Sequence, residues 1–405
     1  MQARADVAVV GAGPAGATCA LDLARAGLEV VLLDKTAPPR YKTCGGAIVG
    51  RALESLDVDV SPSVERSLHR VELSIGAGER ETGLSFAVER SPAPIVMTMR
   101  ASFDLRLVDA ARKAGATLLA PSAFRNLRRA GSRLEVVTDQ GGISVTWVVG
   151  ADGVGSRVAR AAGWGSSPRT IPAIESELRV APDVFDRFAG AARFDFGLIP
   201  HGYGWVFPKR NHLSVGCLTT RRAGYETESR PLGLNRHFEG YLRALGLDRP
   251  LEREDHGFAI PIRPRDRRLA RDGVLLIGDA AGLGDPLTCE GISNAIRSGQ
   301  LAARAMIETR KAPHRTAKTY GDLLEESILP ELRWARRLAP LLYDTPRLRG
   351  FVFGRAGPGL CEAFMDVFSG SRTVRGLLSR PANYGRFLGA LVRSSAATRC
   401  RGRAG

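Results

Sequence analysis

Near its start the chain reads Ala5-Asp6-Val7-Ala8-Val9-Val10 and continues directly into Gly11-Ala12-Gly13-Pro14-Ala15-Gly16. The first run is short, apolar and rich in β-branched residues, which predicts a buried strand. After the glycines, small and apolar residues recur at helical spacing over about 15–26, and Gly27 ends the predicted helix. Residues 28–33 form a second apolar run that ends at Asp34. The order strand, glycine-rich turn, helix, strand and acid predicts a βαβ unit that binds a dinucleotide.

The three glycines of the turn each meet a physical requirement of that unit. Gly11 permits the tight turn, Gly13 lets a pyrophosphate approach the backbone, and Gly16 lets the helix pack closely on the sheet. A glycine-rich turn without any ligand is the structural alternative. The complete strand–helix–strand context favours the dinucleotide site, because an isolated glycine motif is weak evidence by itself.

The rest of this predicted site comes from the start of the helix and the end of the second strand. Pro14 and Ala15 begin the helix, and the partial positive charge of its N-terminus attracts phosphates. Asp34 lies twenty-three residues after Gly11, where its carboxylate can accept hydrogen bonds from the adenosine ribose hydroxyls. Lys35 follows Asp34 directly, and we include it in the predicted cofactor site.

Length and composition indicate a folded protein with more than one lobe. A chain of 405 residues with 44% hydrophobic and 6% aromatic residues is too long for one simple core and is typical of globular proteins. Its six cysteines are scattered, without a Cys-x-x-Cys pair or metal-ligand spacing, so we expect neither a disulfide framework nor a metal site. The sequence has no secretory signal and no apolar run of about eighteen residues. We therefore expect a cytoplasmic protein without membrane spans.

The formal net charge is +16, and much of the excess lies near the C-terminus. Residues 331–405 contain fourteen arginines, no lysine and four acidic residues, a net charge of +10. Three kinds of partner fit such a surface: an anionic membrane contacted from its periphery, a phosphate-bearing substrate, or an acidic electron-donor protein. A plain arginine-rich surface is the simpler alternative. Nucleic acid is not expected, because no binding module or interleaved aromatic residues accompany the charge.

The chain beyond the βαβ unit alternates between helical and strand-like segments. Residues 102–114 predict a helix, and 133–149 predict two strands joined by the turn residues 139–142. A third apolar strand at 274–277 precedes a long helix over about 290–309. The sequence after that helix predicts further helices interrupted by prolines, which are Pro330, Pro340, Pro346, Pro358 and Pro381.

Four further segments carry recognisable residues, and their order along the chain makes them specific. They are 39–46 (Pro-Arg-Tyr-Lys-Thr-Cys-Gly-Gly), 100–104 (Arg-Ala-Ser-Phe-Asp), 150–157 (Gly-Ala-Asp-Gly, then Ser-Arg) and 278–292 (Gly-Asp-Ala-Ala-Gly, then Asp-Pro and Glu-Gly-Ile). With the glycine motif, they make residues 5–310 resemble the geranylgeranyl reductase family, within the larger flavoprotein group that includes aromatic hydroxylases. The Pro-x-x-Tyr-x-x-Cys-Gly-Gly stretch and residues 203–208, Tyr-Gly-Trp-Val-Phe-Pro, resemble the reductase family in particular.

The resemblance implies an activity and a fold. The family saturates carbon–carbon double bonds of isoprenoid chains, with reduced FAD as the immediate hydride source. The implied fold class is α/β: a Rossmann-like FAD-binding domain interleaved with a mostly antiparallel β-sheet substrate domain, followed by a helical C-terminal region. The expected boundaries are 1–70, 99–165 and 270–330 for the FAD-binding domain, 71–98 and 166–269 for the substrate domain, and 331–405 for the helical region.

The Gly-Asp segment provides the second expected contact with FAD. Asp279 follows a predicted strand, where its carboxylate can bind ribityl hydroxyls; a solvated loop acid is the alternative. The helix after Gly291, which begins with Ile292, would point its N-terminus at the flavin pyrimidine edge, where negative charge accumulates on reduction. Pro286 would help to fix the shape of the preceding loop.

Arg100 and Asp152 are further candidates near the cofactor. The Arg100 side chain can contact the flavin chain or its phosphates, and a surface arginine at a helix start is the alternative. Asp152 belongs to the shared Ala-Asp-Gly segment, but its expected position is further from the cofactor. The sequence leaves its role open.

Cys44 and three aromatic residues form the expected reactive end of the site. In the family pattern the Cys44-Gly45-Gly46 turn lies near the reactive ring, and its glycines leave room for a flat cofactor. The Cys44 thiol is either a proton donor or a small buried side chain that lines the pocket. Tyr203, Trp205 and Phe207 alternate along a predicted strand and can wall a pocket for an apolar chain; ordinary core packing is the alternative. None of the histidines has metal-ligand spacing.

Three functions fit this pattern. The first is an FAD-dependent reductase that acts on an isoprenoid chain. The second is an FAD-dependent monooxygenase or halogenase that uses NAD(P)H and oxygen on an aromatic or lipophilic small molecule. The third is a flavin-bearing scaffold or redox sensor without turnover. Only one dinucleotide motif is evident, so the expected electron donor is NADPH bound without its own glycine motif, a reduced ferredoxin, or a quinol.

Overall fold

The predicted strand–helix–strand unit forms as expected. We describe a computed structural model, which covers residues 3–76, 83–165, 167–220, 233–310 and 312–379. In it β2 (Val7–Val10) and β3 (Val30–Leu33) pair in parallel, and α1 (Pro14–Arg25) connects them along the chain. Every residue of β2 and β3 is buried, as apolar strands of a sheet covered on both faces should be.

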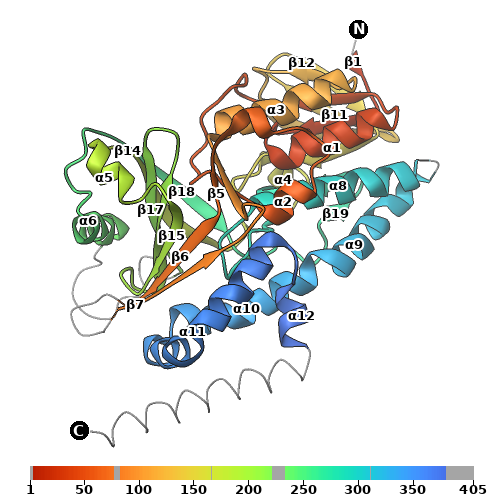
Figure 1. The fold of residues 1–405 in the computed structure, drawn as a ribbon. Helices are drawn as coiled ribbons and strands as arrows, with labels where there is room; N and C mark the ends of the chain where they lie inside the picture. Colours follow the sequence, from red (N-terminus) through yellow and green to blue (C-terminus); the bar gives the residue numbers. More distant parts are fainter. Residues whose placement is uncertain (1–2, 77–82, 166, 221–232, 311, 380–405) are drawn as a thin grey trace, which may run out of the picture.

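This unit is the centre of a six-stranded sheet with the order β19-β20-β13-β2-β3-β9. Its other strands are β9 (Thr117–Leu119), β13 (Trp147–Gly150), β19 (Ala270–Arg271) and β20 (Val274–Leu276). All pairs are parallel except β19 with β20. The helices α3 (Arg100–Lys113) and α8 (Ile292–Glu308) pack against α1. The fold thus combines a parallel sheet with a helical layer (Figure 1).

A four-stranded sheet lies beside β2 and β13, with the order β1-β12-β11-β10. Its strands are β1 (Ala3–Arg4), β10 (Phe124–Ala130), β11 (Arg133–Thr138) and β12 (Gly141–Val145). The expectation of only two strands over 133–149 is wrong, because the chain leaves the hairpin after Val145. Residues 147–150 instead pair in parallel with β2 as β13 of the six-stranded sheet.

A second lobe is built on a seven-stranded sheet with the order β18-β14-β17-β16-β15-β6-β7. Its strands are β6 (Arg70–Ile75), β7 (Leu84–Glu89), β14 (Thr170–Arg179), β15 (Ala191–Phe196), β16 (Gly202–Pro208), β17 (Leu213–Thr219) and β18 (Glu252–Pro261). All pairs are antiparallel except β6 with β15. The expected mostly antiparallel sheet is therefore present, and α6 (Leu234–Leu245) packs on β14 and β17.

A three-stranded sheet contains β4 (Ala47–Val49), β5 (Val64–Leu68) and β8 (Ile95–Thr98). Residues 95–98, expected in the substrate domain, thus pair with β4 and β5 and not with the seven-stranded sheet. The expected domain boundaries stay predictions. Short helices before the C-terminal region, among the residues that the structure describes, are α2 (Gly50–Glu54), α4 (Arg157–Ala161), α5 (Pro182–Asp186), α7 (Gly278–Ala281), η1 (Ser61–Ser63) and η2 (Pro313–Arg315).

The described part of the C-terminal region is helical, as predicted. Its helices are α9 (Thr316–Ser327), α10 (Leu329–Tyr343), α11 (Pro346–Ser369) and α12 (Val374–Leu378). Pro340 and Pro358 lie inside α10 and α11, so the expectation that they interrupt helices is wrong. Packing compensates in α11, where Gly357 sits against the Phe86 ring of β7. Pro381 and six of the fourteen arginines of 331–405 lie outside the described residues.

No helix among the residues described is both long enough and apolar enough to cross a membrane.

Close backbone approach holds α1 against α8. A Cβ atom on Gly299 of α8 would lie 2.4 Å from the Ala15 carbonyl oxygen of α1. The neighbouring Ser298 hydroxyl accepts a hydrogen bond from the Gly278 N–H at 2.9 Å. Any side chain at position 299 would therefore push α1 and α8 apart, and with them two of the segments that form the candidate site.

We predict that Gly299→Ala lowers the free energy of unfolding by about 1–3 kcal/mol, because the added methyl group overpacks a rigid backbone contact. Gly240→Ala in α6 is the control, since a Cβ there meets nothing within 4 Å. That control should raise stability by roughly 0.5–1 kcal/mol through its better helix propensity. Urea unfolding measures the stability of both variants. If Gly299→Ala stabilised the protein as much as Gly240→Ala, the close contact between Gly299 and Ala15 would be contradicted.

Candidate active site

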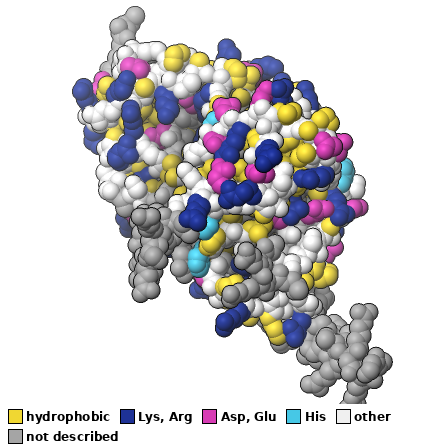
Figure 2. Space-filling view, turned by 90° about the vertical axis from the view of Figure 1, so that its left-hand side faces the viewer, with side chains coloured by type: hydrophobic (Ala, Val, Ile, Leu, Met, Phe, Trp, Pro, Cys, Tyr) yellow, Lys and Arg dark blue, Asp and Glu magenta, His cyan; other side chains and the backbone are white. Residues whose placement is uncertain are grey.

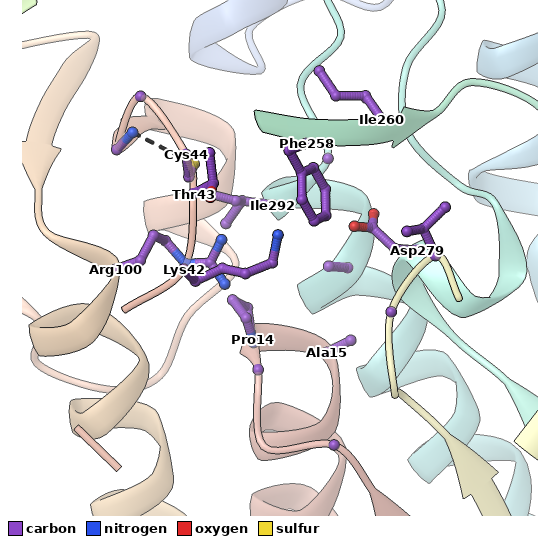
Figure 3. A pocket seen from close by; sticks show the side chains of 18 of the residues that line it. Pro14, Ala15, Lys42, Thr43, Cys44, Arg100, Phe258, Ile260, Asp279 and Ile292 are labelled. Atoms are coloured by element: carbon purple, nitrogen blue, oxygen red, sulfur yellow. Dashed lines mark hydrogen bonds between the residues drawn. The ribbon is translucent and has the colours of Figure 1, made fainter. Parts of the chain in front are cut away.

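One cavity of about 830 Å³ is lined by residues of both main sheets and of the loop that follows β3. Figure 3 shows Pro14 and Ala15 at the start of α1 on one side, Asp279 on a second and Arg100 on a third. The structure therefore brings together segments that are more than 250 residues apart in the sequence. They include most of the predicted cofactor contacts: Gly11, Gly13, Pro14, Ala15, Asp34, Lys35, Cys44, Gly45, Gly46, Arg100, Asp279, Gly291 and Ile292.

The first end of the cavity is a bare helix N-terminus. Gly11 has φ +108°, and a Cβ there would lie 2.3 Å from the Ala151 carbonyl oxygen. Gly13 is the N-cap of α1, and no side chain caps the helix, so its first N–H groups are available for an anion. A Cβ on Gly16 would lie 1.9 Å from the Gly11 oxygen, so Gly16 permits the turn to close but does not line the cavity. This backbone cradle fits the pyrophosphate of FAD.

Asp34 lines the cavity and lies at one end of a chain of charged side chains. Its Oδ2 accepts a hydrogen bond from the Ala12 N–H at 2.9 Å and lies 3.3 Å from Arg40 Nε. Arg40 also reaches Asp104, at 3.2 Å, and Asp104 binds Arg100 at 2.8 Å. Sequence reasoning did not identify Arg40, although it belongs to the segment 39–46. The predicted contact between Asp34 and a ribose stays a prediction.

Arg100 and Cys44 lie on the same side of the cavity. Burial would lower the pKa of the Arg100 guanidinium, but Asp104 and Cys44 beside it hold that pKa above its ordinary value. Cys44 Sγ accepts a hydrogen bond from the Gly46 N–H at 3.4 Å (Figure 3). Arg100 is thus a charged cavity residue and not a free surface arginine. The role of Cys44 as a proton donor stays a prediction.

The second end of the cavity holds Asp279 next to the start of α8. Burial raises the pKa of Asp279, whereas Lys42 and Arg100 oppose that rise. A Cβ on Gly291, the N-cap of α8, would lie 3.5 Å from Asp279 Oδ1. Pro286 is buried in the preceding turn and does not line the cavity. Its predicted role in shaping the loop remains open.

Lys42 lies in the middle of the cavity, a position that sequence reasoning missed. Its Nζ stands 3.0 Å from the centroid of the Phe258 ring, and Figure 3 shows it pointing into the space between α1 and Phe258. Burial lowers the pKa of Lys42 to about 8, and the Arg100 charge adds to that decrease. The residue was visible in the segment 39–46, but its orientation depends on the loop conformation.

An aromatic wall covers the side of the cavity formed by the seven-stranded sheet. Tyr203, Trp205 and Phe207 alternate along β16 and line the cavity together. The ring centroids of Tyr203 and Trp205 are 6.0 Å apart, and those of Trp205 and Phe207 are 6.2 Å apart. Phe194 of β15 joins them, 5.2 Å from Phe207. Further apolar lining residues that the sequence did not reveal are Leu218, Phe258, Ile260 and Phe368.

Asp152 is held by hydrogen bonds to residues at the start of α4. Its carboxylate accepts hydrogen bonds from the Ser156 hydroxyl and from the N–H groups of Arg157 and Val158 at the start of α4. It also lines the cavity. Among the residues that the structure describes, no cluster of His, Cys, Asp or Glu is arranged to hold a metal ion.

Known families and proteins match this arrangement. Residues 4–323 match the family described as an FAD binding domain. The chain is 33% identical over 360 residues to digeranylgeranylglycerophospholipid reductase 1 of Methanopyrus kandleri, across 83% of this chain and 90% of that protein. The chain belongs to the geranylgeranyl reductase family. It is also 29% identical over 383 residues to the chloroplastic geranylgeranyl diphosphate reductase of Nicotiana tabacum, across 89% of this chain and 77% of that protein.

The family is one of FAD-dependent oxidoreductases, and solved structures confirm the fold class. A geranylgeranyl bacteriochlorophyll reductase-like protein of Thermoplasma acidophilum superposes with a TM-score of 0.72 at 22% identity, covering 96% of each chain. A halogenase in complex with FAD superposes with a TM-score of 0.71 at 18% identity, covering 99% of this chain and 92% of that chain. At such identities the likeness concerns the fold and does not separate reductase from halogenase chemistry.

We predict that Asp34→Ala weakens FAD binding about tenfold to a hundredfold. The ribose loses a charged acceptor worth roughly 1.5–3 kcal/mol, and the Ala12 N–H loses its partner. Asp109→Ala, which removes a partly exposed carboxylate from α3, is the control and should leave FAD affinity unchanged. Absorbance titration of the apoprotein measures both affinities, and equal affinities would show that Asp34 does not hold the cofactor.

Proposed function

We propose that this protein is an FAD-dependent reductase of carbon–carbon double bonds in an isoprenoid chain. The observation that carries the proposal is the continuity of the cavity, which joins a backbone cradle for FAD to an apolar aromatic wall. The Gly11–Gly16 turn, Asp34 and the start of α8 would hold FAD. When bound and reduced, FAD would supply a hydride. The aromatic wall and the Phe258–Ile260 side would hold the substrate chain.

The composition of the wall supports an apolar substrate chain. Trp205, Phe207 and Phe194 present ring faces and edges, and they are each less than 10% exposed. Such a surface binds by excluding water, which suits a hydrocarbon chain better than a polar ring. Trp205 Nε1 is buried without a hydrogen-bond partner within the described residues.

The names of relatives support the isoprenoid class without fixing the head group. They include a digeranylgeranylglycerophospholipid reductase, a geranylgeranyl diphosphate reductase and a menaquinone reductase of Mycolicibacterium smegmatis, which is 28% identical over 368 residues, across 86% of each chain. The compounds in those names carry an isoprenoid-type chain and differ in the group attached to that chain. We propose that the aromatic wall recognises the chain.

The proposed activity predicts a gain of two hydrogens for each double bond reduced. Protein reduced chemically under anaerobic conditions, which makes the natural electron donor unnecessary, is mixed with isoprenoid lipid extract and analysed by mass spectrometry. Products heavier by two hydrogens are expected. Hydroxylated or halogenated products that form only when oxygen is admitted would instead support the monooxygenase or halogenase alternative, and a flavin that reacts with neither would support the scaffold or sensor alternative.

The electron donor is a further part of the proposal. NADPH, a reduced ferredoxin and a quinol each remain a candidate, and direct reduction of the bound flavin by each donor distinguishes them. Within the described residues, basic side chains are interspersed with acidic and apolar ones on the face shown in Figure 2. That face does not present a continuous basic patch for an acidic donor protein.

We also propose that the junction of α10 and α11 contacts an anionic membrane from its periphery. Leu341, Leu348 and Phe351 lie within eleven residues and are 48%, 45% and 50% exposed. Arg355 stands over the Phe351 ring, 3.9 Å from its centroid. Exposed apolar side chains beside arginines suit the boundary between lipid head groups and acyl chains.

The prediction is that the protein sediments with phosphatidylserine-containing vesicles at low salt and less so at 0.5 M salt, where screening is strong. Leu348→Ser with Phe351→Ser should reduce binding severalfold. Leu251→Ser is the matched control, because Leu251 is 65% exposed on the other lobe. Vesicle binding that changes neither with salt nor in the Leu348→Ser, Phe351→Ser double variant would refute the proposed surface.

A further inference from the structure

A buried group of charged side chains lies behind the cavity wall, outside the predicted cofactor contacts. Glu175 of β14 lines the cavity and is 2% exposed. Glu177 follows two residues later on the same strand, so both side chains project from one face of the sheet. Lys209, which is 0% exposed, places Nζ 3.7 Å from Glu177 Oε1. Burying this many ionisable groups in one place is costly unless they are paired or protonated.

The group approaches solvent at His212 and, to a smaller extent, at Glu177, whose side chain is 11% exposed. His212 Nε2 lies 3.0 Å from Glu177 Oε2, and the His212 side chain is 19% exposed. Glu177 is therefore the neighbour of both the partly exposed His212 and the buried Glu175. Three side chains, His212, Glu177 and Glu175, span the distance from solvent to the cavity.

The environment of Glu175 favours the protonated acid. Burial raises the pKa of Glu175 to about 7, and the Glu177 carboxylate adds to the rise. The Ser214 hydroxyl, which donates a hydrogen bond to Oε1 at 2.6 Å, and the Cys44 backbone oppose that rise. Oε2 is buried and makes no hydrogen bond within the described residues. An acid with a pKa near the working pH can both donate a proton and regain it.

Glu177 is held in the opposite state. Burial would raise its pKa, but His212 and Lys209 beside it keep that pKa below the usual range. The opposite directions of the two pKa shifts favour the protonated form of Glu175, next to the cavity, over that of Glu177. The titratable groups that face the Glu175 carboxyl are Glu177 on the same strand, His256 on β18, Lys209 after β16, and Tyr41 and Cys44 in the loop after β3.

We propose that Glu175 donates the proton that reduction of a double bond consumes, and that His212 and Glu177 return a proton to it from solvent. This inference rests on the proposed reductase function. One alkene carbon gains the hydride that reduced FAD supplies, and the other gains the Glu175 proton. The π bond breaks, two C–H bonds form, and the flavin loses two electrons. The Glu175 carboxylate that remains is neutralised by one proton from solvent, so charge and atoms balance.

The first test compares isosteric variants in the reduced holoenzyme under anaerobic conditions, with geranylgeranyl diphosphate as the probe. Glu175→Gln should bind FAD normally and slow reoxidation of the flavin by roughly 10²–10⁴-fold, as loss of a general acid does. Asp195→Asn is the control, because Asp195 is equally buried in the same sheet but hydrogen-bonds Tyr241 of α6. An unchanged rate in Glu175→Gln together with a large loss in Cys44→Ser would assign the proton to the thiol and overturn the proposal.

The pH dependence adds a second readout. The rate should fall as pH rises through about 7, because Glu175 loses its proton there, and Glu175→Gln should remove that decline. His212→Ala should slow repeated turnover, and added imidazole should restore it. Unchanged turnover in both variants would overturn the proton route.

A third readout does not depend on activity. It distinguishes a failure of the Glu175 assignment from a failure of the proposed reductase function. Infrared titration of the oxidised holoenzyme should show a protonated carboxyl band that disappears near pH 7 and is missing in Glu175→Gln. Absence of that band in the unmutated protein would refute the assigned proton. If the band is present but geranylgeranyl diphosphate never reoxidises the flavin of the unmutated protein, the proposed reductase function fails instead.

Discussion

The close approach of three backbone segments around the start of α1 determines the geometry of the cavity. Gly11 meets the Ala151 carbonyl, Gly16 meets the Gly11 carbonyl, and Gly299 meets the Ala15 carbonyl at distances that no Cβ atom could tolerate. The N-cap residue between them, Gly13, has no side chain that could cap the helix, so the first N–H groups of α1 are available at the cavity. The same contacts place α8, and with it Gly291, on the adjoining wall.

The two ends of the cavity differ in the charge of the side chains that line them. The cradle end is ionic, with Asp34, Arg40, Asp104 and Arg100 in one network. The sheet end is lined by buried aromatic side chains. At their boundary lie Lys42, with a pKa lowered to about 8, and Glu175, with a pKa raised to about 7. Burial moves both values toward neutrality, which is where proton transfer is efficient.

The sequence predicted the parts whose signal is local. The βαβ unit, the Gly-Asp turn and the alternating aromatics of β16 follow from glycine positions and from periods of 3.6 and 2. Lys42 and Arg40 were within a recognised motif, but their orientation depends on a loop that carries no periodicity. Glu175, Lys209 and His212 are brought together by the pairing of β14, β16 and β17. The register of that pairing cannot be predicted from the sequence of any one strand. The prolines of α10 and α11 mislead for a related reason, since tertiary packing outweighs their local cost.

Single-turnover stoichiometry tests whether FAD and an isoprenoid chain react within one cavity. The bound flavin is reduced without excess reductant and mixed anaerobically with geranylgeranyl diphosphate, and oxidised flavin and saturated bonds are then counted in the same sample. We expect one double bond to be saturated for each flavin reoxidised. Flavin that stays reduced, or that is reoxidised without any saturated bond, would contradict it.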